Sequence, residues 1–123
     1  MDKQKILVAD DEPGVRLLVS RMLGEEYIVL EAADGEEALD IARRQQPALI
    51  LMDLMMPKID GYAACLRIKT DQITKEIPVV ILTAIGHDLS KRFAEEMGAN
   101  GYITKPFTRE DLLEETRRLL PSG

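Results

Sequence analysis

Three acidic residues stand where two predicted strands end. Asp10 and Asp11 follow the apolar run Ile6–Ala9, and Asp53 follows the apolar run Leu49–Met52. In an open α/β sheet of strand order 2-1-3-4-5, the ligand crevice lies beyond the carboxyl ends of strands one and three. Carboxylates gathered in a poorly solvated crevice disfavour one another's charged form unless a cation compensates them. These residues therefore predict a divalent cation site.

Magnesium suits this predicted site better than zinc. Mg²⁺ takes oxygen ligands and keeps several of its waters, whereas zinc sites need Cys or His at fixed spacings. The chain has one Cys and one His, which cannot supply such a set. We therefore expect Mg²⁺ as the cofactor.

The other predicted strand ends carry a hydroxyl and an amine. Thr83 follows the apolar run Val79–Leu82, and Lys105 follows a short run around Tyr102–Ile103. A hydroxyl, an ammonium group and a cation near one carboxylate suit a tetrahedral anion attached to that carboxylate, and Asp can act as the nucleophile in phosphoryl transfer. Asp53 is the predicted acceptor. A purely structural role explains it poorly, because a carboxylate between apolar neighbours is costly without partners.

Each of these residues alone has a structural explanation. Acidic residues before Pro13 are typical of a helix start, Thr83 is a common strand residue, and a Lys before Pro is typical of a loop. Their convergence favours a site, because residues with purely structural roles would be scattered over both edges of the sheet.

Five strand-and-helix units must position these side chains. The predicted strands are Ile6–Ala9, Ile28–Leu30, Leu49–Met52, Val79–Leu82 and a short one around Tyr102–Ile103. Apolar spacing predicts helices over Pro13–Leu23, Glu36–Arg44 and about Tyr62–Lys69, a fourth marked by Leu89, Phe93 and Met97, and a fifth marked by Leu112, Leu113, Leu119 and Leu120. Asp34 and Thr108 each precede an acidic residue by three positions, which is typical of a helix start. We place His87 in a loop.

This alternation predicts an α/β fold, a single doubly wound, flavodoxin-like sheet of five parallel strands in order 2-1-3-4-5 with five helices. A length of 123 residues suits one domain with one hydrophobic core, and we expect residues 1–123 to form it. A closed eight-unit barrel would need about twice this length.

Composition and charge exclude several classes of protein. The chain is 46% hydrophobic and 31% charged, which is typical of a soluble globular domain. Its net charge of −6 disfavours direct binding to nucleic acid or to membranes. The start Met-Asp-Lys-Gln-Lys lacks the apolar stretch of a secretory signal, and one Cys allows no internal disulfide. We expect a cytoplasmic protein.

The chain resembles the receiver domain of two-component response regulators over essentially its whole length. The motifs that carry the resemblance are Asp10-Asp11, Asp53-Leu54-Met55-Met56-Pro57-Lys58-Ile59-Asp60-Gly61, Thr83-Ala84 and Lys105-Pro106-Phe107. The resemblance implies a phosphorelay in which Asp53 takes a phosphoryl group from a sensor histidine kinase or a phosphotransfer protein. It also implies that Asp11, Asp53 and the Met55 carbonyl bind Mg²⁺, with Asp10 helping through water.

The same resemblance implies a switch. Lys105 and Thr83 are expected to contact phosphoryl oxygens, Tyr102 to be the switch aromatic, and the Lys105–Pro106 bond to be cis. Phosphorylation would change the surface formed by the last two predicted helices and the strand between them. A downstream protein, an output domain or a second copy of the chain would bind there.

Two other functions stay open at this point. A flavodoxin-like mononucleotide-binding protein shares the strand order, but its phosphate loop should carry hydroxyls and glycines where this chain has Asp10-Asp11-Glu12-Pro13. An aspartate-nucleophile phosphatase would separate its two acids by one residue and add a cap domain. We expect a switch limited to self-phosphorylation and self-dephosphorylation rather than a multiple-turnover enzyme, either free-standing or part of a longer protein.

Two apolar residues predict a long-lived phosphorylated state. Met55 stands two residues after Asp53, and Ile85 stands two residues after Thr83. Neither side chain can hydrogen-bond a water in line with an acyl phosphate. We therefore hypothesise slow self-dephosphorylation.

Overall fold

The computed structural model describes residues 3–120, apart from the side chain of His87, and these form five strands that alternate with five helices. In chain order the elements are β1 (Lys5–Ala9), α1 (Pro13–Leu23), β2 (Ile28–Ala32), α2 (Gly35–Gln45), β3 (Leu49–Asp53), α3 (Gly61–Thr70), β4 (Val79–Thr83), α4 (His87–Met97), β5 (Gly101–Thr104) and α5 (Arg109–Leu119).

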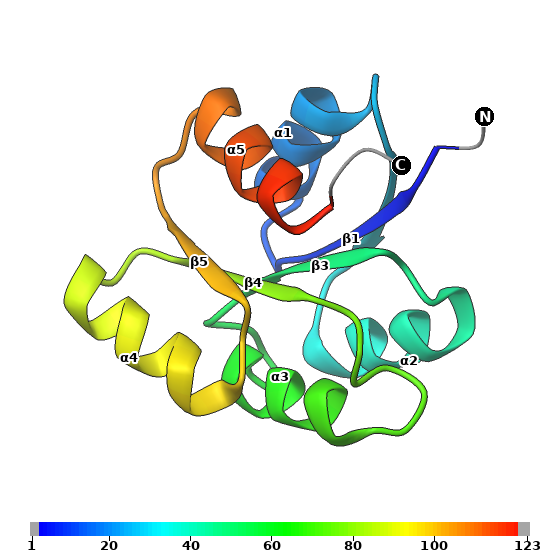
Figure 1. Ribbon diagram of the computed structural model, residues 1–123, viewed down its shortest axis with the longest axis vertical. Coiled ribbons are helices and arrows are strands. Elements are labelled where there is room, and N and C mark those ends of the chain that lie inside the picture. Colours follow the sequence, from blue (N-terminus) through cyan, green and yellow to red (C-terminus); the bar gives the residue numbers. More distant parts are fainter. Residues whose placement is uncertain (1–2, 121–123) are drawn as a thin grey trace.

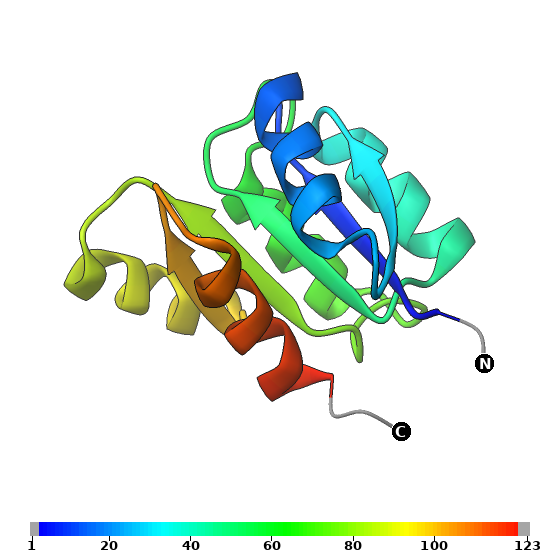
Figure 2. The same cartoon turned by 90° about the horizontal axis from the view of Figure 1, so that it is seen from above.

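The strands form one parallel sheet in the order β2-β1-β3-β4-β5, which confirms the predicted fold class and strand order. Helices α1 and α5 cover one face, and α2, α3 and α4 cover the other (Figure 1). In Figure 2, α1 and α5 lie in front of the sheet. Every residue of β3 and β4 is buried, because both strands are covered on both faces.

Two apolar layers form the core, one on each face of the sheet, where we had predicted a single hydrophobic core. Side chains alternate along β1: Ile6 and Val8 belong to the layer under α1 and α5, whereas Leu7 and Ala9 belong to the layer over α2, α3 and α4. The sheet therefore divides the core, and an apolar central strand contributes to both halves.

Capping groups fix the starts of two helices that follow strand ends. At α5, the Thr108 hydroxyl accepts from the Asp111 N–H while the Asp111 carboxylate accepts from the Thr108 N–H, so the predicted capping box is present. At α2, the Asp34 carboxylate accepts from the Glu37 N–H, and the Glu37 carboxylate accepts from the Ala33 N–H. Both loops are thereby held at the carboxyl edge of the sheet.

The bounds of β1, β2, β3, β4, α2 and α3 differ from the prediction by one or two residues, whereas those of α1 agree with it. Asp53 and Thr83 are the last residues of β3 and β4, which confirms their predicted places at the ends of these strands. The placement of His87 in a loop is wrong, because α4 begins at this residue, with Gly86 as its N-cap and the Gly86 carbonyl accepting from the Ser90 N–H. The carboxyl ends of the strands keep their predicted positions.

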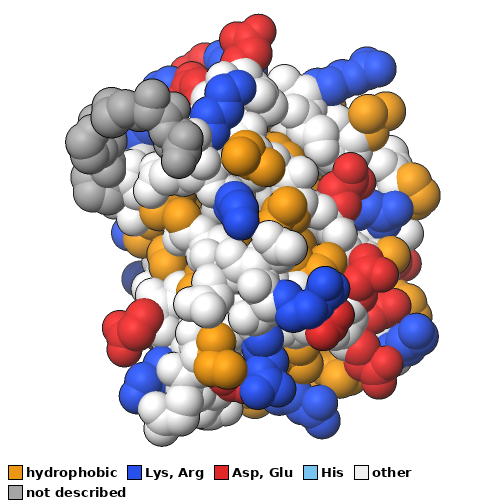
Figure 3. Space-filling view, turned by 90° about the vertical axis from the view of Figure 1, so that its right-hand side faces the viewer, with side chains coloured by type: hydrophobic (Ala, Val, Ile, Leu, Met, Phe, Trp, Pro, Cys, Tyr) orange, Lys and Arg blue, Asp and Glu red, His pale blue; other side chains and the backbone are white. Residues whose placement is uncertain are grey.

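The surface mixes charged and apolar side chains. On the face in Figure 3, hydrophobic side chains are scattered between acidic and basic ones rather than gathered in one large patch. Within residues 3–120, no helix is both long enough and apolar enough to cross a membrane.

Candidate functional site

Asp53 ends β3 in the centre of the sheet and is 6% exposed. Its position in the sheet places it beside Leu82 of β4, one residue before Thr83. Both contacts of its carboxylate within the described chain go to Oδ1, which lies 3.4 Å from the Met55 N and 3.4 Å from Nζ of Lys105. The second carboxylate oxygen is therefore available at the carboxyl edge of the sheet.

Asp10 lies beside this position at the end of β1 and is fully buried. Its Oδ1 accepts from the Glu12 N–H at 2.9 Å, and its Oδ2 lies 2.9 Å from Nζ of Lys105. Its own N–H donates to the Ala32 carbonyl of β2 at 3.0 Å. Because the side chain and the main chain are both engaged, Asp10 is held rigidly in the wall of the site.

Lys105 connects the two carboxylates. The register of β4 and β5 sets Thr83 beside Thr104, so Lys105 leaves the sheet at the same edge, and its N–H donates to the Thr83 carbonyl at 2.7 Å. The Lys105–Pro106 peptide bond is cis. Burial alone lowers the pKa of Lys105, but the hydrogen bond to Asp10 and the charges of Asp53 and Asp10 outweigh it, so the pKa is raised and the ammonium form is favoured.

The surroundings of Asp53 disfavour its charged form, whereas those of Lys105 favour the charged form of the amine. Burial, followed by repulsion from Asp10, raises the pKa of Asp53 above its ordinary value, although Lys105 and the Met55 N–H act against the shift. A further positive charge beside Asp53 would stabilise its ionised form. The site therefore favours cations next to Asp53.

Thr83 closes the site from β4 and is 2% exposed. Its Oγ1 accepts a hydrogen bond from the Ile85 N–H at 3.0 Å. This bond leaves the hydroxyl proton available to another acceptor, because the Ile85 N–H occupies only a lone pair.

These side chains surround a cavity of about 330 Å³. The residues that line it are Asp11, Glu12, Asp53, Leu54, Met55, Thr83, Ala84, Ile85 and Lys105. Asp10 is buried next to it, in contact with Lys105. Tyr102 lies elsewhere, on β5, and lines a second cavity. The structure thus brings together the candidate residues from β1, β3, β4 and β5, with Tyr102 outside the cavity.

The donor set fits a hard divalent cation. Asp10, Asp11 and Glu12 each offer a carboxylate oxygen, and these oxygens all lie within 4.8 Å of one another. Asp53 and Met55 line the cavity together with Asp11 and Glu12, and the Asp53 carboxylate adds further oxygen donors. Oxygen donors of this kind are what Mg²⁺ requires. Glu12 is an additional candidate metal ligand that the sequence analysis did not include. Its place directly after Asp10-Asp11 could have indicated it.

Arg16 is a second residue that sequence reasoning missed. Its Nη1 donates to the Asp10 carbonyl at 2.6 Å, and its Nε lies 3.1 Å from Oε1 of Glu31 on β2. The guanidinium thereby ties the loop after β1 to the neighbouring strand. The sequence carries no signal for this role, because the contact is made to a main-chain oxygen.

Gly61 packs closely against the main chain of Asp53. Its N–H donates to the Leu54 carbonyl at 3.0 Å, and a Cβ on this residue would collide with the Asp53 carbonyl oxygen. The start of α3 therefore lies directly against the end of β3, and only glycine allows this approach.

Comparisons with known proteins agree with one another. A family model described as "Response regulator receiver domain" matches residues 6–117. The DNA-binding dual master transcriptional regulator RpaA of Synechocystis sp. is 43% identical over 119 residues, which are 94% of this chain and 48% of that protein. The chain spans about half the length of the curated relatives it matches.

Solved structures share the fold over nearly the whole chain. The receiver domain of the sensor histidine kinase PA1611 from Pseudomonas aeruginosa, with a magnesium ion coordinated in its active-site cleft, has a TM-score of 0.90 and 33% identity, and covers 98% of this chain and 100% of its own. The chemotaxis protein CheY4 of Vibrio cholerae has a TM-score of 0.89 and 32% identity, and covers 96% and 99% respectively.

Proposed function

The chain belongs to the response regulator receiver domain family, the signalling switches of two-component systems, and on that premise we propose that Asp53 is its phosphoacceptor. The observation that carries this proposal is the placement of the Lys105 ammonium 2.9 Å from Asp10 and 3.4 Å from Asp53, at a cavity that Thr83 also lines. A receiver domain that extends over all of residues 1–123 is part of the proposal.

The proposed reaction is a transfer between two nucleophiles. A carboxylate oxygen of Asp53 attacks the phosphorus of a phosphohistidine on a sensor kinase or phosphotransfer protein. The oxygen–phosphorus bond forms as the phosphorus–nitrogen bond breaks, and the electron pair of that bond returns to the partner's imidazole nitrogen. Lys105 and the Thr83 hydroxyl offer hydrogen-bond donors to the phosphoryl oxygens, and positioning with charge neutralisation supplies the catalysis.

Magnesium is the proposed cofactor. Asp11, Asp53 and the Met55 carbonyl would hold Mg²⁺, with Asp10 acting through water and Glu12 at the rim of the same cavity. The ion supplies neutralisation of the negative charge on the carboxylates and on the phosphoryl oxygens. Asp10 stays in contact with Lys105, which limits the repulsion between Asp10 and Asp53.

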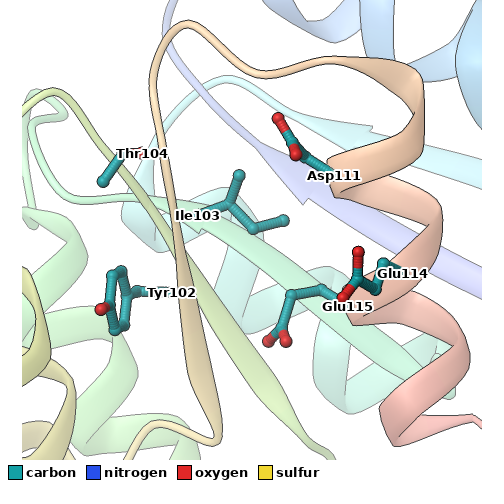
Figure 4. Close-up of a pocket in the computed structure, with 6 residues that line it drawn as sticks. All are labelled: Tyr102, Ile103, Thr104, Asp111, Glu114 and Glu115. Atoms are coloured by element: carbon teal, nitrogen blue, oxygen red, sulfur yellow. The ribbon is translucent and has the colours of Figure 1, made fainter. Parts of the chain in front are cut away.

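The proposed output surface is formed by α4, β5 and α5. On β5, Ile103 points toward α5 and Tyr102 points away from it (Figure 4). Tyr102 and Ile85 of the loop after β4 both pack against the apolar layer over α2, α3 and α4. We expect Thr83 to shift toward a phosphoryl group, and Tyr102 to follow as the apolar layer repacks. New acceptor oxygens and negative charge supply the differential contacts that such a shift of populations needs.

The acidic lining of this surface favours a basic partner. A cavity of about 370 Å³ lies beside β5, and its lining includes Asp111, Glu114 and Glu115 of α5 (Figure 4). The downstream protein, output domain or second copy that binds there is expected to place a Lys or Arg side chain against Glu114, because Asp111 caps α5 and Glu115 pairs with Arg118 at 2.8 Å. The switch is proposed to perform only self-phosphorylation and self-dephosphorylation, without turnover of a separate substrate.

Intact-mass measurement tests the proposed phosphoacceptor. The chain is incubated with acetyl phosphate and Mg²⁺, in parallel with Asp53→Asn and with the same mixture in excess EDTA. We expect the addition of one phosphoryl group to the unmodified chain in Mg²⁺ alone. Equal labelling of Asp53→Asn, or equal labelling in EDTA, would contradict the proposal.

A further inference from the structure

We propose that Ser90 is a positioning residue that holds the Thr83 hydroxyl in its resting place and so sets the threshold for activation. This inference rests on the proposed function, because it concerns the step in which Thr83 responds to a phosphoryl group. Ser90 belongs to α4, outside the cavity that contains Asp53.

The main chain of Ile85 lies between two hydroxyl groups. Its N–H donates to Oγ1 of Thr83 at 3.0 Å, and its carbonyl accepts from Oγ of Ser90 at 2.9 Å. A hydrogen-bonded chain therefore runs from the end of β4, through the loop after it, to the first turns of α4. The path joins the candidate phosphoryl contact to the helix that forms one side of the output surface.

Burial makes this contact energetically significant. Thr83 is 2% exposed and Ser90 is 1% exposed, and Ile85 itself is only half-buried in the loop between them. Because the Ser90 side chain is buried, water does not readily replace its bond to the Ile85 carbonyl, and loss of this bond is felt more strongly than at the surface. The N-cap residue of α4 is Gly86, which has no side chain to hold the loop. Ser90 thus provides the side-chain anchor at this helix start.

The anchor opposes the movement proposed for Thr83. The shift proposed for Thr83 takes its Oγ1 toward a phosphoryl oxygen on Asp53 and changes its position relative to the Ile85 N–H. The loop that carries Ile85 must then adjust, and the bond from Ser90 holds that loop to α4. Removing the Ser90 hydroxyl therefore raises the energy of the resting arrangement relative to the activated one.

Ser90→Ala tests the proposal, with beryllofluoride as the phosphoryl analogue. We expect Ser90→Ala to bind beryllofluoride in Mg²⁺ about fivefold more tightly than the unmodified chain, the factor that corresponds to one net hydrogen bond. The Ile85 amide proton should also exchange faster in the free protein, because its loop has lost an anchor. The second readout does not depend on phosphoryl chemistry.

Thr116→Ala is the matched control. Thr116 lies on α5, is fully buried, and donates from its hydroxyl to the Leu112 carbonyl at 2.8 Å, so its replacement also removes one hydrogen bond made by a buried helical hydroxyl. Within residues 3–120 its hydroxyl bonds to Leu112 and not to Thr83 or Ile85, so its replacement should leave beryllofluoride affinity unchanged. When Thr83 is already replaced by Ala, adding Ser90→Ala should not change beryllofluoride affinity, because the hydroxyl that Ser90 positions is absent.

The outcomes separate this inference from the proposed function. Tighter binding by Ser90→Ala that disappears in the Thr83→Ala background supports the role of Ser90. Unchanged or weaker binding, or an equal gain in Thr116→Ala, overturns it while the phosphoacceptor proposal stands. If the unmodified chain does not bind beryllofluoride in Mg²⁺, the proposed function fails and the activation role fails with it, whatever the Ile85 exchange shows.

Discussion

The Lys105 Nζ lies 2.9 Å from Oδ2 of Asp10, so the ammonium is anchored to the wall of the site and reaches Asp53 from there at 3.4 Å. One cation compensates two buried carboxylates. The site is therefore assembled before any ligand arrives, and its stability depends on the balance of three charges.

Replacing Lys105 with Met tests this balance. Without the ammonium, Asp10 and Asp53 repel each other with no compensating charge, and we expect a loss of about 2 kcal/mol of unfolding free energy in EDTA. Mg²⁺ should restore more stability to this variant than to the unmodified chain, because the ion then replaces a missing charge. Denaturant unfolding with and without Mg²⁺ measures both effects. Lys91→Met, at an exposed position on α4, is the control, and an equal response to Mg²⁺ in both variants would contradict the account.

The raised pKa of Asp53 gives a stability effect with a definite sign. Burial and the charge of Asp10 raise its pKa in the folded chain, so folding is favoured while the group is protonated, and that stability is lost as the pH rises above the unfolded value. In EDTA, Asp53→Asn should therefore be more stable than the unmodified chain at pH 7, by about 1 kcal/mol. The difference should disappear toward acidic pH. Unfolding midpoints across a pH series test this, and a difference that grows on acidification would refute it.

Replacing Gly61 and Gly14 with Ala tests the close packing of Gly61 against the main chain of Asp53, with Gly14 as the matched control. A Cβ at Gly61 meets the Asp53 carbonyl oxygen, which is main chain and cannot move aside, so Gly61→Ala should cost about 3 kcal/mol. A Cβ at Gly14 in α1 meets nothing within 4 Å, and Gly14→Ala should stabilise the chain by about 0.5 kcal/mol. Thermal unfolding compares the two, and similar effects at both positions would disprove the close packing.

Met55 and Ile85 are predicted to give the phosphorylated chain a long lifetime. Met55 is 73% exposed, and both side chains line the cavity without offering a strong hydrogen-bond partner to water. Replacing them with Asn and Gln should shorten the lifetime of the phosphorylated state on the order of tenfold, because a polar side chain can orient the attacking water. Decay of the phosphorylated mass after removal of the donor gives the rate. The apolar pair Met55→Leu and Ile85→Val is the control, and an unshortened lifetime in the polar variant argues against the hypothesis.

Much of the fold follows from local patterns. The bounds of α1 agree with the prediction, because Pro13 favours the first helical position and the apolar spacing ends before Gly24. The uninterrupted apolar runs of β3 and β4 indicated strands covered on both faces, and both are fully buried. Because parallel strands all end at one edge, Asp53, Thr83 and Lys105 could be expected to converge.

Two of the residues that sequence reasoning missed, Arg16 and Ser90, act through main-chain atoms. Arg16 donates to the Asp10 carbonyl, and Ser90 donates to the Ile85 carbonyl. Every residue has a carbonyl, so no residue type or spacing marks the acceptor. A contact between two side chains, such as that of Lys105 with Asp10, depends on both residue types and can be expected from the sequence. A contact with a main-chain carbonyl depends on only one of them.

The central claim is that a phosphoryl group on Asp53 changes the surface of α4, β5 and α5. Amide NMR spectra during titration with beryllofluoride in Mg²⁺ test it most directly. We predict shifts at Thr83 and Ile85 together with shifts at Tyr102 and along α4 and α5, all absent from Asp53→Asn. Shifts confined to the cavity, or the same shifts in Asp53→Asn, would contradict the claim.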